Sequence, residues 1–387
     1  FETNKLIMKK ILVWTTVILS FLLILIYAFN VEYLLKGVRT IYLTGNNTAF
    51  ISDYEYFENR EIKNSVPQPW LLHEKYNSVT QSENLKKLNE ETKTKSFLVI
   101  KNDSIVFEKY FDDHKSTSLS NSFSVAKSIV TSMLFKAIME GKIKGLDQPL
   151  SDYFEEYKEG LASELTVGDL ASMSSGMKWS EIYYNVINIT SESCFTDDLR
   201  SVVLRQDIID KPGQSFRYSS GDTQLLGMVI EKATGTTLTN YLSEKFWQPM
   251  GAENSALWQI DSAKSGMEKA YCCIASTARD FARFGKLFIN KGKWNDEMIL
   301  DPSYIDLSIN PVFEDSPYYG YGWWLYNYEG KKVFTMNGHL GQFVISFPDE
   351  NIIIVRQGDY NNKGNGDGSS DLFQYIAEGY KIATSIE

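Results

Sequence analysis

A serine and a lysine three residues apart are the most reactive combination in this chain. Ser124-x-x-Lys127 stands at the head of a long apolar run. Because positions i and i+3 share one face of an α-helix, the Lys127 amine can reach the Ser124 hydroxyl. A serine hydroxyl is a weak nucleophile until an adjacent base takes its proton, and a partly desolvated lysine can be that base. The pair therefore predicts covalent catalysis by Ser124.

A second copy of this spacing, Ser175-x-x-Lys178, shows that the pattern alone is not specific. It contains Gly176 and continues without a sustained helical pattern. The first copy leads instead into an apolar helix over 128–140 that ends at Gly141. A nucleophile at the N-terminus of such a helix also gains from its dipole and free amides. The first copy is therefore the better candidate.

Two further segments offer the proton donor and the backbone amides that acyl transfer requires. Tyr218 precedes a predicted helix over 222–234, and it can serve as general acid or base if lysines lower its pKa from about 10. The alternative is a tyrosine packed beneath the turn. The glycines around His339 lie between two predicted strands, where they allow close approach to a ligand and the Gln342 amide can complete an oxyanion hole. His339 alone is more often a structural histidine.

Predicted strands near both ends of the main domain enclose a mainly helical segment. The strand patterns cover a hairpin and four C-terminal segments: 96–110, 322–326, 332–336, 342–347 and 352–356. Two helices are predicted among and after them, at 276–290 with a Ser or Thr cap and at 371–384. This order predicts an α+β fold, with an antiparallel sheet formed by N- and C-terminal strands, flanking helices, and a helical insertion at about 142–265.

Composition excludes several classes of function. With 387 residues, 43% of them hydrophobic, the chain can form one large core with an inserted subdomain. A net charge of −10 without any basic cluster argues against nucleic acid as a partner. The three histidines lie too far apart for metal-ligand spacing: His73, His114 and His339. We therefore expect neither a metal nor a cofactor.

The cysteine count argues against a disulfide framework. The chain has three cysteines: Cys194, Cys272 and Cys273. Adjacent cysteines seldom bridge each other, and an odd count leaves at least one thiol over. We expect all three to be small buried hydrophobic residues.

The N-terminal region contains a candidate membrane segment. The uncharged run from Ile11 to Phe29 follows two lysines and is long enough to cross the ~30 Å hydrocarbon core of a bilayer. No small-residue cleavage site ends it. We expect residues 1–10 to be cytoplasmic, 11–30 to form a signal anchor, 31–92 an extended arm, and 93–387 an extracytoplasmic main domain. Export after signal cleavage is the alternative.

The three segments around Ser124, Tyr218 and His339, in this order along the chain, resemble the motifs of serine hydrolases related to class C β-lactamases and D,D-peptidases. The likeness is greatest to the branch of 6-aminohexanoate-dimer hydrolases and esterases, and it covers roughly residues 40 to 380. The family motifs are Ser-x-x-Lys, Tyr-x-Asn or Tyr-x-Ser, and Lys/His-x-Gly. Their counterparts here are Ser124-x-x-Lys127, Tyr218-x-Ser220 and His339-x-Gly341. The resemblance implies a serine β-lactamase-like fold and reduces Ser175 to a structural turn residue.

The resemblance also implies roles. Ser124 would be the acylated nucleophile, Lys127 would help remove its proton, and Tyr218 would pass that proton to the leaving group. The backbone amides of Ser124 and Gln342 would form the oxyanion hole. Four residues would lie along the substrate: Tyr183, Ser220, His339 and Gly341. For Tyr183, in a segment that lines the cleft in the aminohexanoate branch, a packed aromatic is the alternative.

Two departures from the family pattern bear on the substrate. Ser220 stands where β-lactamases usually have asparagine, and His339-Leu340 replaces the Lys-Thr that binds a β-lactam carboxylate. Each lost charge-assisted hydrogen bond is worth roughly 1–3 kcal/mol. We therefore expect hydrolysis of small esters, amides or peptides rather than efficient β-lactam turnover. The alternative is a catalytically silent module that binds a ligand or cell-wall peptide, although such a module has no physical need of the whole catalytic set.

Overall fold

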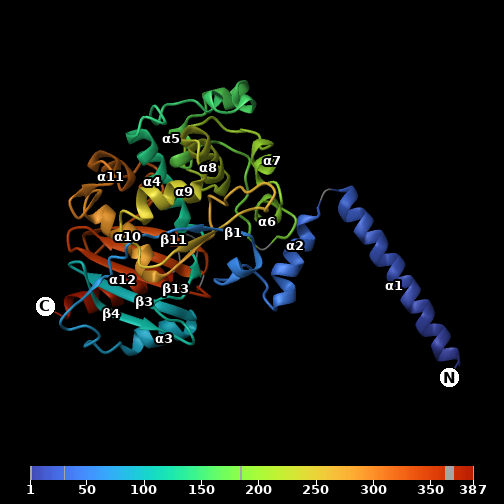
Figure 1. Ribbon diagram of the computed structural model, residues 1–387, viewed down its shortest axis with the longest axis horizontal. Coiled ribbons are helices and arrows are strands. Elements are labelled where there is room, and N and C mark those ends of the chain that lie inside the picture. Colours follow the sequence, from blue (N-terminus) through green and yellow to red (C-terminus); the bar gives the residue numbers. More distant parts are fainter. Residues whose placement is uncertain (1, 30, 184, 362–369, 387) are drawn as a thin grey trace.

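A seven-stranded sheet forms the centre of the molecule (Figure 1). The computed structural model describes residues 2–29, 31–183, 185–361 and 370–386. In spatial order the strands are β10 (Trp324–Tyr328), β11 (Lys331–Gly338), β12 (Gln342–Phe347), β13 (Ile352–Gly358), β3 (Thr94–Lys101), β4 (Ser104–Tyr110) and β2 (Leu71–Leu72). Neighbouring strands are antiparallel except β2 and β4. The predicted sheet of N- and C-terminal strands is therefore confirmed.

Alternating side chains divide the core into two layers, one on each face of this sheet. On β3, Phe97 and Val99 enter one hydrophobic cluster, whereas Leu98 and Ile100 enter the other. The first cluster is covered by α3 (Glu83–Glu91) and α12 (Ser370–Thr384). The second is covered by α10 (Ala278–Ile289) and α4 (Val125–Met139). The α10 helix is capped by Thr277, whose side chain accepts from the Asp280 amide, as the sequence predicts.

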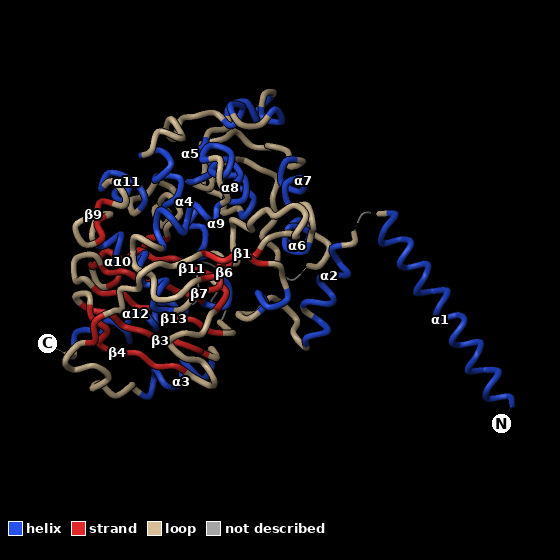
Figure 2. The backbone as a smooth tube through the Cα atoms, viewed as in Figure 1, coloured by secondary structure: helices blue, strands red, loops and turns tan. Residues whose placement is uncertain are grey.

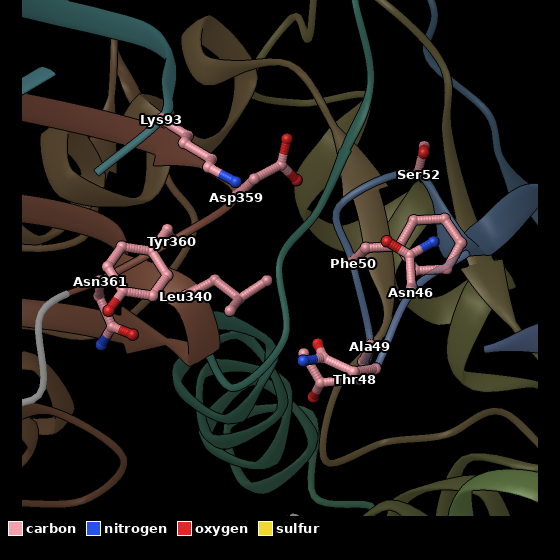
Figure 3. A pocket seen from close by; sticks show the side chains of 11 residues that line it. Asn46, Thr48, Ala49, Phe50, Ser52, Lys93, Leu340, Asp359, Tyr360 and Asn361 are labelled. Atoms are coloured by element: carbon pink, nitrogen blue, oxygen red, sulfur yellow. The ribbon is translucent and has the colours of Figure 1, made fainter. Parts of the chain in front are cut away.

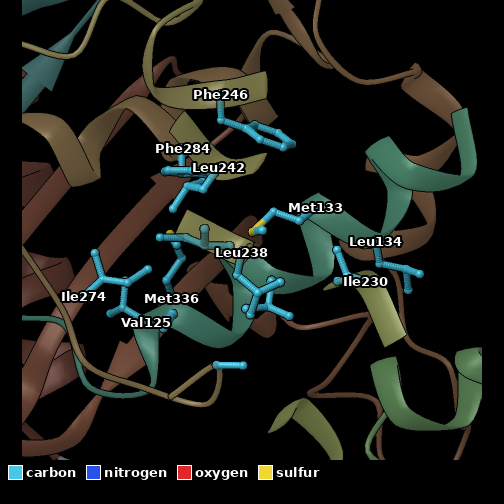
Figure 4. Packing of buried hydrophobic residues seen from close by; sticks show 14 of the residues in the cluster. Val125, Met133, Leu134, Ile230, Leu238, Leu242, Phe246, Ile274, Phe284 and Met336 are labelled. Carbon is cyan, nitrogen blue, oxygen red and sulfur yellow. The ribbon is translucent and has the colours of Figure 1, made fainter. Parts of the chain in front are cut away.

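The helical insertion lies beyond α4, which packs against α8 (Ser220–Thr234). Figure 2 shows helices gathered at that end of the molecule and strands at the other. The other helices of this region are α5 (Val167–Ala171), α6 (Ile189–Phe195), α7 (Leu199–Leu204) and α9 (Leu238–Leu242). Figure 4 shows apolar side chains of α4, α8 and α9 meeting those of α10 and β11. One continuous core thus holds the helical region against the sheet.

Smaller elements complete the fold. A four-stranded sheet has the order β1 (Asn59–Ile62), β6 (Ala256–Gln259), β7 (Ile274–Ser276) and β5 (Ser120–Asn121). The hairpin of β8 (Lys293–Trp294) and β9 (Glu297–Met298) is followed by α11 (Pro302–Ser308). Through β5 and β7, the four-stranded sheet reaches the residues just before α4.

Residues 31–92 contain more regular structure than the extended arm expected from their polar composition. They form α2 (Tyr33–Thr40), β1, β2 and α3. Leu85 and Leu88 of α3 are buried in the core, because this short helix is apolar on one side only. Earlier parts of this stretch also pack on the main body, because β2 pairs with β4, and Ile62 and Trp70 lie in the larger hydrophobic cluster.

The first helix, α1 (Glu2–Ala28), projects away from the body, with α2 and α6 between them (Figure 1). Among the described residues, Asn4–Ala28 is the one stretch long and apolar enough to cross a membrane, and its side chains are largely exposed. A membrane anchor and a signal sequence share these properties.

Candidate active site

Ser124 occupies the N-cap position of α4, and its hydroxyl is available for chemistry because the side chain caps no backbone amide. The Lys127 amine lies 3.0 Å from the Ser124 hydroxyl oxygen. The residue before the nucleophile, Phe123, has a φ of 47°, a strained conformation for a bulky side chain. The structure thus brings together the pair that the sequence predicts, at the start of a buried helix.

Lys127 is buried without a salt bridge among the described residues. Its amine also donates to the Tyr271 carbonyl at 3.0 Å. Burial lowers the pKa of Lys127 to about 8, and the negative charges of Glu181 and Asp222 oppose that change. A neutral amine held by the Tyr271 carbonyl has a lone pair free to accept the Ser124 proton. The geometry and the lowered pKa suit a general base.

Tyr218 lies at the end of the turn before α8, next to the N-cap Ser219. The Tyr218 ring packs against Trp324 at 5.5 Å between centroids, and the Lys127 amine lies 4.9 Å from the centroid of the Tyr218 ring. Burial, followed by the charge of Glu181, raises the pKa of Tyr218, whereas a hydrogen bond with Ser124 acts in the opposite direction. The condition set from the sequence, that lysines lower this pKa, is therefore not met. A phenol that keeps its proton suits proton relay better than it suits a free phenolate base.

The turn between β11 and β12 approaches the nucleophile closely. Gly338 pairs with Gln342 across the two strands. A Cβ atom at Gly338 would lie 2.3 Å from the Ser122 carbonyl oxygen, so only glycine allows this approach. The Gln342 side chain is held by the His339 and Gly358 carbonyls, at 3.1 and 2.7 Å. These contacts place the start of β12 beside the N-terminus of α4.

A buried arginine fixes the conformation of the same turn. Arg356 of β13 donates to the Leu340 and Gly341 carbonyls, at 2.6 and 2.8 Å. Leu340 and Gly341 have φ values of 60° and 80°. A Cβ atom at Gly341 would lie 2.6 Å from an Arg356 guanidinium nitrogen. Gly341, predicted as a substrate contact, therefore has a clear structural role in this turn.

Glu181 connects several of the predicted substrate residues. Its carboxylate accepts from the Ser220 amide and hydroxyl, at 2.5 and 3.1 Å, and from the Tyr183 hydroxyl at 2.5 Å. The Tyr183 ring stacks on His339 at 5.3 Å between centroids. Phe123 meets the same imidazole edge-on at 5.4 Å. Tyr183, Ser220 and His339 therefore lie together at one side of the nucleophile.

The second Ser-x-x-Lys copy is built differently. Ser175 is buried, and its hydroxyl donates to Asp222 at 2.6 Å. Lys178 is exposed. The Ser175 oxygen also accepts from the Met177 amide, which closes a tight turn. This serine has a structural hydrogen-bonding role and no adjacent amine.

A cavity of about 320 Å³ opens beside the nucleophile. Its wall includes Ser124, Tyr183, Ser220 and His339 together with Cys272 and Cys273. The sulfur atoms of Cys272 and Cys273 form a disulfide, so the expectation of two free, buried hydrophobic cysteines is wrong. Cys273 has a φ of 75°, a backbone conformation that a pattern of adjacent cysteines does not reveal. Cys194, which also lines the cavity, is a free thiol.

A second, more polar cavity of about 1010 Å³ borders the first (Figure 3). It lies between residues 46–52 and the end of β13, and Leu340 is among its lining residues. The two cavities share Asn47, Thr48 and Ala49. Residues 47–49 thus lie between the cavity beside Ser124 and this more polar cavity, which none of Ser124, Lys127 and Tyr218 lines.

The structure brings together Ser124 and Lys127, which the sequence predicts as nucleophile and base, whereas the local sequence pattern does not single out Glu181 or Arg356. Glu181 lies in the segment that was recognised through Tyr183, and its position two residues before that tyrosine was the available signal. Arg356 had no local signal, because it reads as one charged residue at the end of an apolar strand. Among the described residues, no cluster of His, Cys, Asp or Glu is suited to a metal.

The α+β fold thus places a serine, and a lysine three residues later, at the start of a buried helix. The chain belongs to the β-lactamase family, because the family model described as Beta-lactamase matches residues 83–369. That match covers α3 to the end of the central sheet, including all three motifs.

Individual relatives are more distant. A 6-aminohexanoate-dimer hydrolase of Paenarthrobacter ureafaciens is 25% identical over 226 residues, which are 55% of this chain and 56% of the relative. Protein flp of Staphylococcus aureus is 23% identical over 177 residues, 43% of this chain and 35% of that protein. The chain therefore spans about a third to a little over half the length of these curated relatives.

Solved structures share the fold. A Bacillus anthracis protein assigned as a 6-aminohexanoate-dimer hydrolase has a TM-score of 0.73 at 22% identity, covering 87% of this chain and 93% of the other. The D-amino acid amidase of Ochrobactrum anthropi SV3 has a TM-score of 0.62 at 15% identity, covering 78% and 97%. A class C β-lactamase has a TM-score of 0.58 at 15% identity, covering 81% and 99%.

Proposed function

We propose that this protein is a serine hydrolase that cleaves small ester, amide or peptide bonds through an acyl-enzyme on Ser124. The observation that carries the proposal is the 3.0 Å contact between the Ser124 hydroxyl and a buried Lys127 amine whose pKa falls to about 8. A lysine with its ordinary pKa would hold its proton at neutral pH and could not act as the base. Relatives described as hydrolases and an amidase agree with this reaction class.

In the first half-reaction, the neutral Lys127 amine takes the Ser124 proton as the oxygen attacks the carbonyl carbon. The backbone amides of Ser124 and Gln342 stabilise the oxyanion. The bond to the leaving group then breaks, and the Tyr218 phenol donates its proton to the departing atom. The protonated Lys127 amine in turn gives its proton to the Tyr218 oxygen. Lys127 and Tyr218 act as one coupled pair, so their titration belongs to both.

In the second half-reaction, water replaces the leaving group. The neutral amine removes a proton from that water, the acyl bond to Ser124 breaks, and the serine recovers its proton. Ser220, held by Glu181, and the stacked pair of Tyr183 and His339 line the path of the substrate. We assign them to substrate binding rather than to proton transfer.

We further propose that α1 anchors the protein in a membrane, with the catalytic domain on the extracytoplasmic side. The length and composition of Asn4–Ala28 support a membrane span. Two lysines just before the apolar core, Lys9 and Lys10, favour a cytoplasmic N-terminus. Protease protection in sealed vesicles tests the orientation, because an extracytoplasmic domain is cleaved only from that side.

Turnover of p-nitrophenyl acetate and of small amides by the full-length chain tests the hydrolase assignment. Ser124→Ala and Lys127→Ala should each lower turnover to the level without enzyme, whereas the exposed Lys178→Ala should retain the wild-type rate. Nitrocefin turnover should be slow at most, because Ser220 and His339-Leu340 lack the usual β-lactam donors. Ligand binding without any turnover by the wild type would instead favour a silent binding module.

A further inference from the structure

The wall of the catalytic cleft includes the helix that follows the candidate membrane span. Tyr33, Leu34, Gly37 and Val38 of α2 line the cavity that Ser124 opens into. Apolar side chains form much of this wall: Leu34, Val38 and Ile41 come from α2 and the residue after it, Val186 and Phe195 from the facing α6 region, and Phe123 from the residue before Ser124. A volume of about 320 Å³ lies within the range of small-molecule sites. We call this space the α2 groove.

The α2 helix is fixed to the catalytic domain. Lys36 donates to the Asp197 carboxylate at 2.9 Å and to the Asp261 carbonyl at 2.8 Å. A Cβ atom at Gly37 would lie 3.3 Å from the Phe195 ring, so the absence of a side chain lets α2 approach α6 closely. The α2 groove is therefore a built part of the domain, rather than a gap beside a loose arm.

The same helix is tied closely to the membrane candidate. The last residue of α1 is Ala28 and the first of α2 is Tyr33. Five residues span at most about 18 Å when fully extended. The Val31 amide hydrogen-bonds to the Ile26 carbonyl, which shortens the connection further. If α1 spans a bilayer, Tyr33, which lines the α2 groove, therefore lies within about 18 Å of the end of that span.

Apolar side chains are exposed at the α2 groove. Val38, Tyr42 and Val186 line the groove and are exposed, and Leu43, Ile182 and Ile187 are exposed next to groove residues in the sequence. Exposed apolar groups gathered at the edge of a binding site are typical of a surface that meets lipid.

The geometry of the catalytic residues indicates which part of a substrate enters the groove. Tyr218, which faces the leaving group, packs against Tyr319 and Trp324 and does not line the α2 groove. Ser124 does line it. The leaving group therefore lies on the Tyr218 side, and the acyl group extends into the α2 groove.

We propose that the α2 groove binds the acyl chain of a membrane-resident ester or amide, which Ser124 cleaves at the bilayer surface. The inference rests on the proposed hydrolase function and on α1 as the anchor. The products are a fatty acid, released from Ser124 by water, and the alcohol or amine that leaves with a proton through Tyr218.

Chain-length dependence tests the groove. The full-length chain, in micelles of an ester-free detergent, is assayed with p-nitrophenyl acetate, butyrate and octanoate. Each buried methylene should raise kcat/KM by up to about fourfold, so octanoate should exceed acetate by well over tenfold. Acetate turnover that is lost in Ser124→Ala tests the hydrolase assignment by itself. The ratio of the octanoate rate to the acetate rate tests the groove. If acetate is cleaved but octanoate gains nothing, the groove proposal is overturned.

Two variants that fill the α2 groove, and one matched control, test whether the acyl chain of the substrate binds there. Val38→Trp on α2 and Val186→Trp on the opposite wall should each lower the ratio of kcat/KM for octanoate to kcat/KM for acetate by tenfold or more. Leu35→Trp changes a similarly exposed residue of the same helix that does not line the groove, and should leave both substrates unchanged. A chain-length preference that survives both filling variants would contradict the proposal.

Whether the ester substrate enters the groove from the bilayer or from water is tested in vesicles. The full-length chain is reconstituted in phosphatidylcholine and phosphatidylglycerol vesicles, and a dodecanoyl ester is dissolved either in the same vesicles or in a separate population. Hydrolysis should be at least tenfold faster when enzyme and ester share a bilayer. Equal initial rates would mean that the ester arrives through water, and would overturn entry from the bilayer.

Discussion

Gly338 packs directly against the backbone of Ser122, two residues before the nucleophile. A Cβ atom at position 338 would lie 2.3 Å from the Ser122 carbonyl oxygen. This approach joins two parts of the site that come from different sheets: the N-terminus of α4, which follows β5 of the four-stranded sheet, and the turn between β11 and β12 of the seven-stranded sheet, which leads to the Gln342 amide. The position is in extended backbone, with φ of −124°, so its requirement for glycine is steric rather than conformational.

Gly338→Ala should therefore separate the turn from α4. A displacement of about 1 Å at an oxyanion donor costs on the order of 100-fold in rate, so we expect kcat to fall by about that factor with the fold retained. Gly145→Ala, where a Cβ meets no atom within 4 Å, is the matched control. Circular dichroism and ester hydrolysis on both variants check the result, and unchanged turnover in Gly338→Ala would argue against this placement of the oxyanion hole.

The pH dependence of kcat/KM should report the state of Lys127. Burial lowers the pKa of Lys127 to about 8. Only the neutral amine can accept the serine proton, so activity should rise as pH increases through that value and then level off. A limb near the ordinary lysine value of 10.5 would contradict a desolvated base.

Glu181→Gln should move that limb toward lower pH. The Glu181 carboxylate raises the pKa of Lys127 by its charge, so its removal favours the neutral amine. Glutamine keeps the size of the side chain and an oxygen that accepts from the Ser220 amide. A shift in the opposite direction in a full pH–rate profile would mean that Glu181 acts in another way.

Substitution of the serine in the second Ser-x-x-Lys copy, Ser175, should lower stability without abolishing catalysis. Ser175→Ala removes a hydrogen bond to the buried Asp222 carboxylate, which should lower the free energy of unfolding by roughly 1–3 kcal/mol. The folded variant should still hydrolyse esters. Urea denaturation and turnover at low temperature measure the two effects separately, and a folded but inactive Ser175→Ala would implicate this turn in catalysis.

The order of elements could be predicted from the sequence because apolar periodicity and turn residues carry it. The strands from β10 to β13 and the helices α4, α8, α10 and α12 all follow such local patterns. The three motifs were also visible, since each combines a reactive side chain with a fixed spacing. These features depend on neighbours in sequence.

The remaining parts of the site depend on contacts between distant segments. Arg356 binds the turn at residues 339–341 from the neighbouring strand, and Lys127 is held by the carbonyl of Tyr271. The raised pKa of Tyr218 comes from burial and from Glu181, neither of which a motif reveals. The α2 groove arises where the arm packs on α6. Such features follow from tertiary packing rather than from local pattern.

The segment after α2 should make stability depend on pH. Burial raises the pKa of Asp53 from 3.8 to about 6, while Asn121 and Gln259 donate to its carboxylate at 2.7 and 2.9 Å. Between those pH values the folded state binds more protons than the unfolded state, so stability falls as pH rises, by up to about 1.4 kcal/mol per unit. Asp53→Asn should remove that part of the slope. Denaturant titrations at several pH values check this, and parallel curves for the two proteins would contradict it.

The most direct test of the account is the intact mass of the full-length protein after treatment with a serine-directed fluorophosphonate. The account predicts one adduct in the wild type and in Lys178→Ala, and none in Ser124→Ala or Lys127→Ala. Ser124 would then be a nucleophile that depends on its lysine. An unmodified wild type, or an adduct that survives Ser124→Ala, would contradict the central claim.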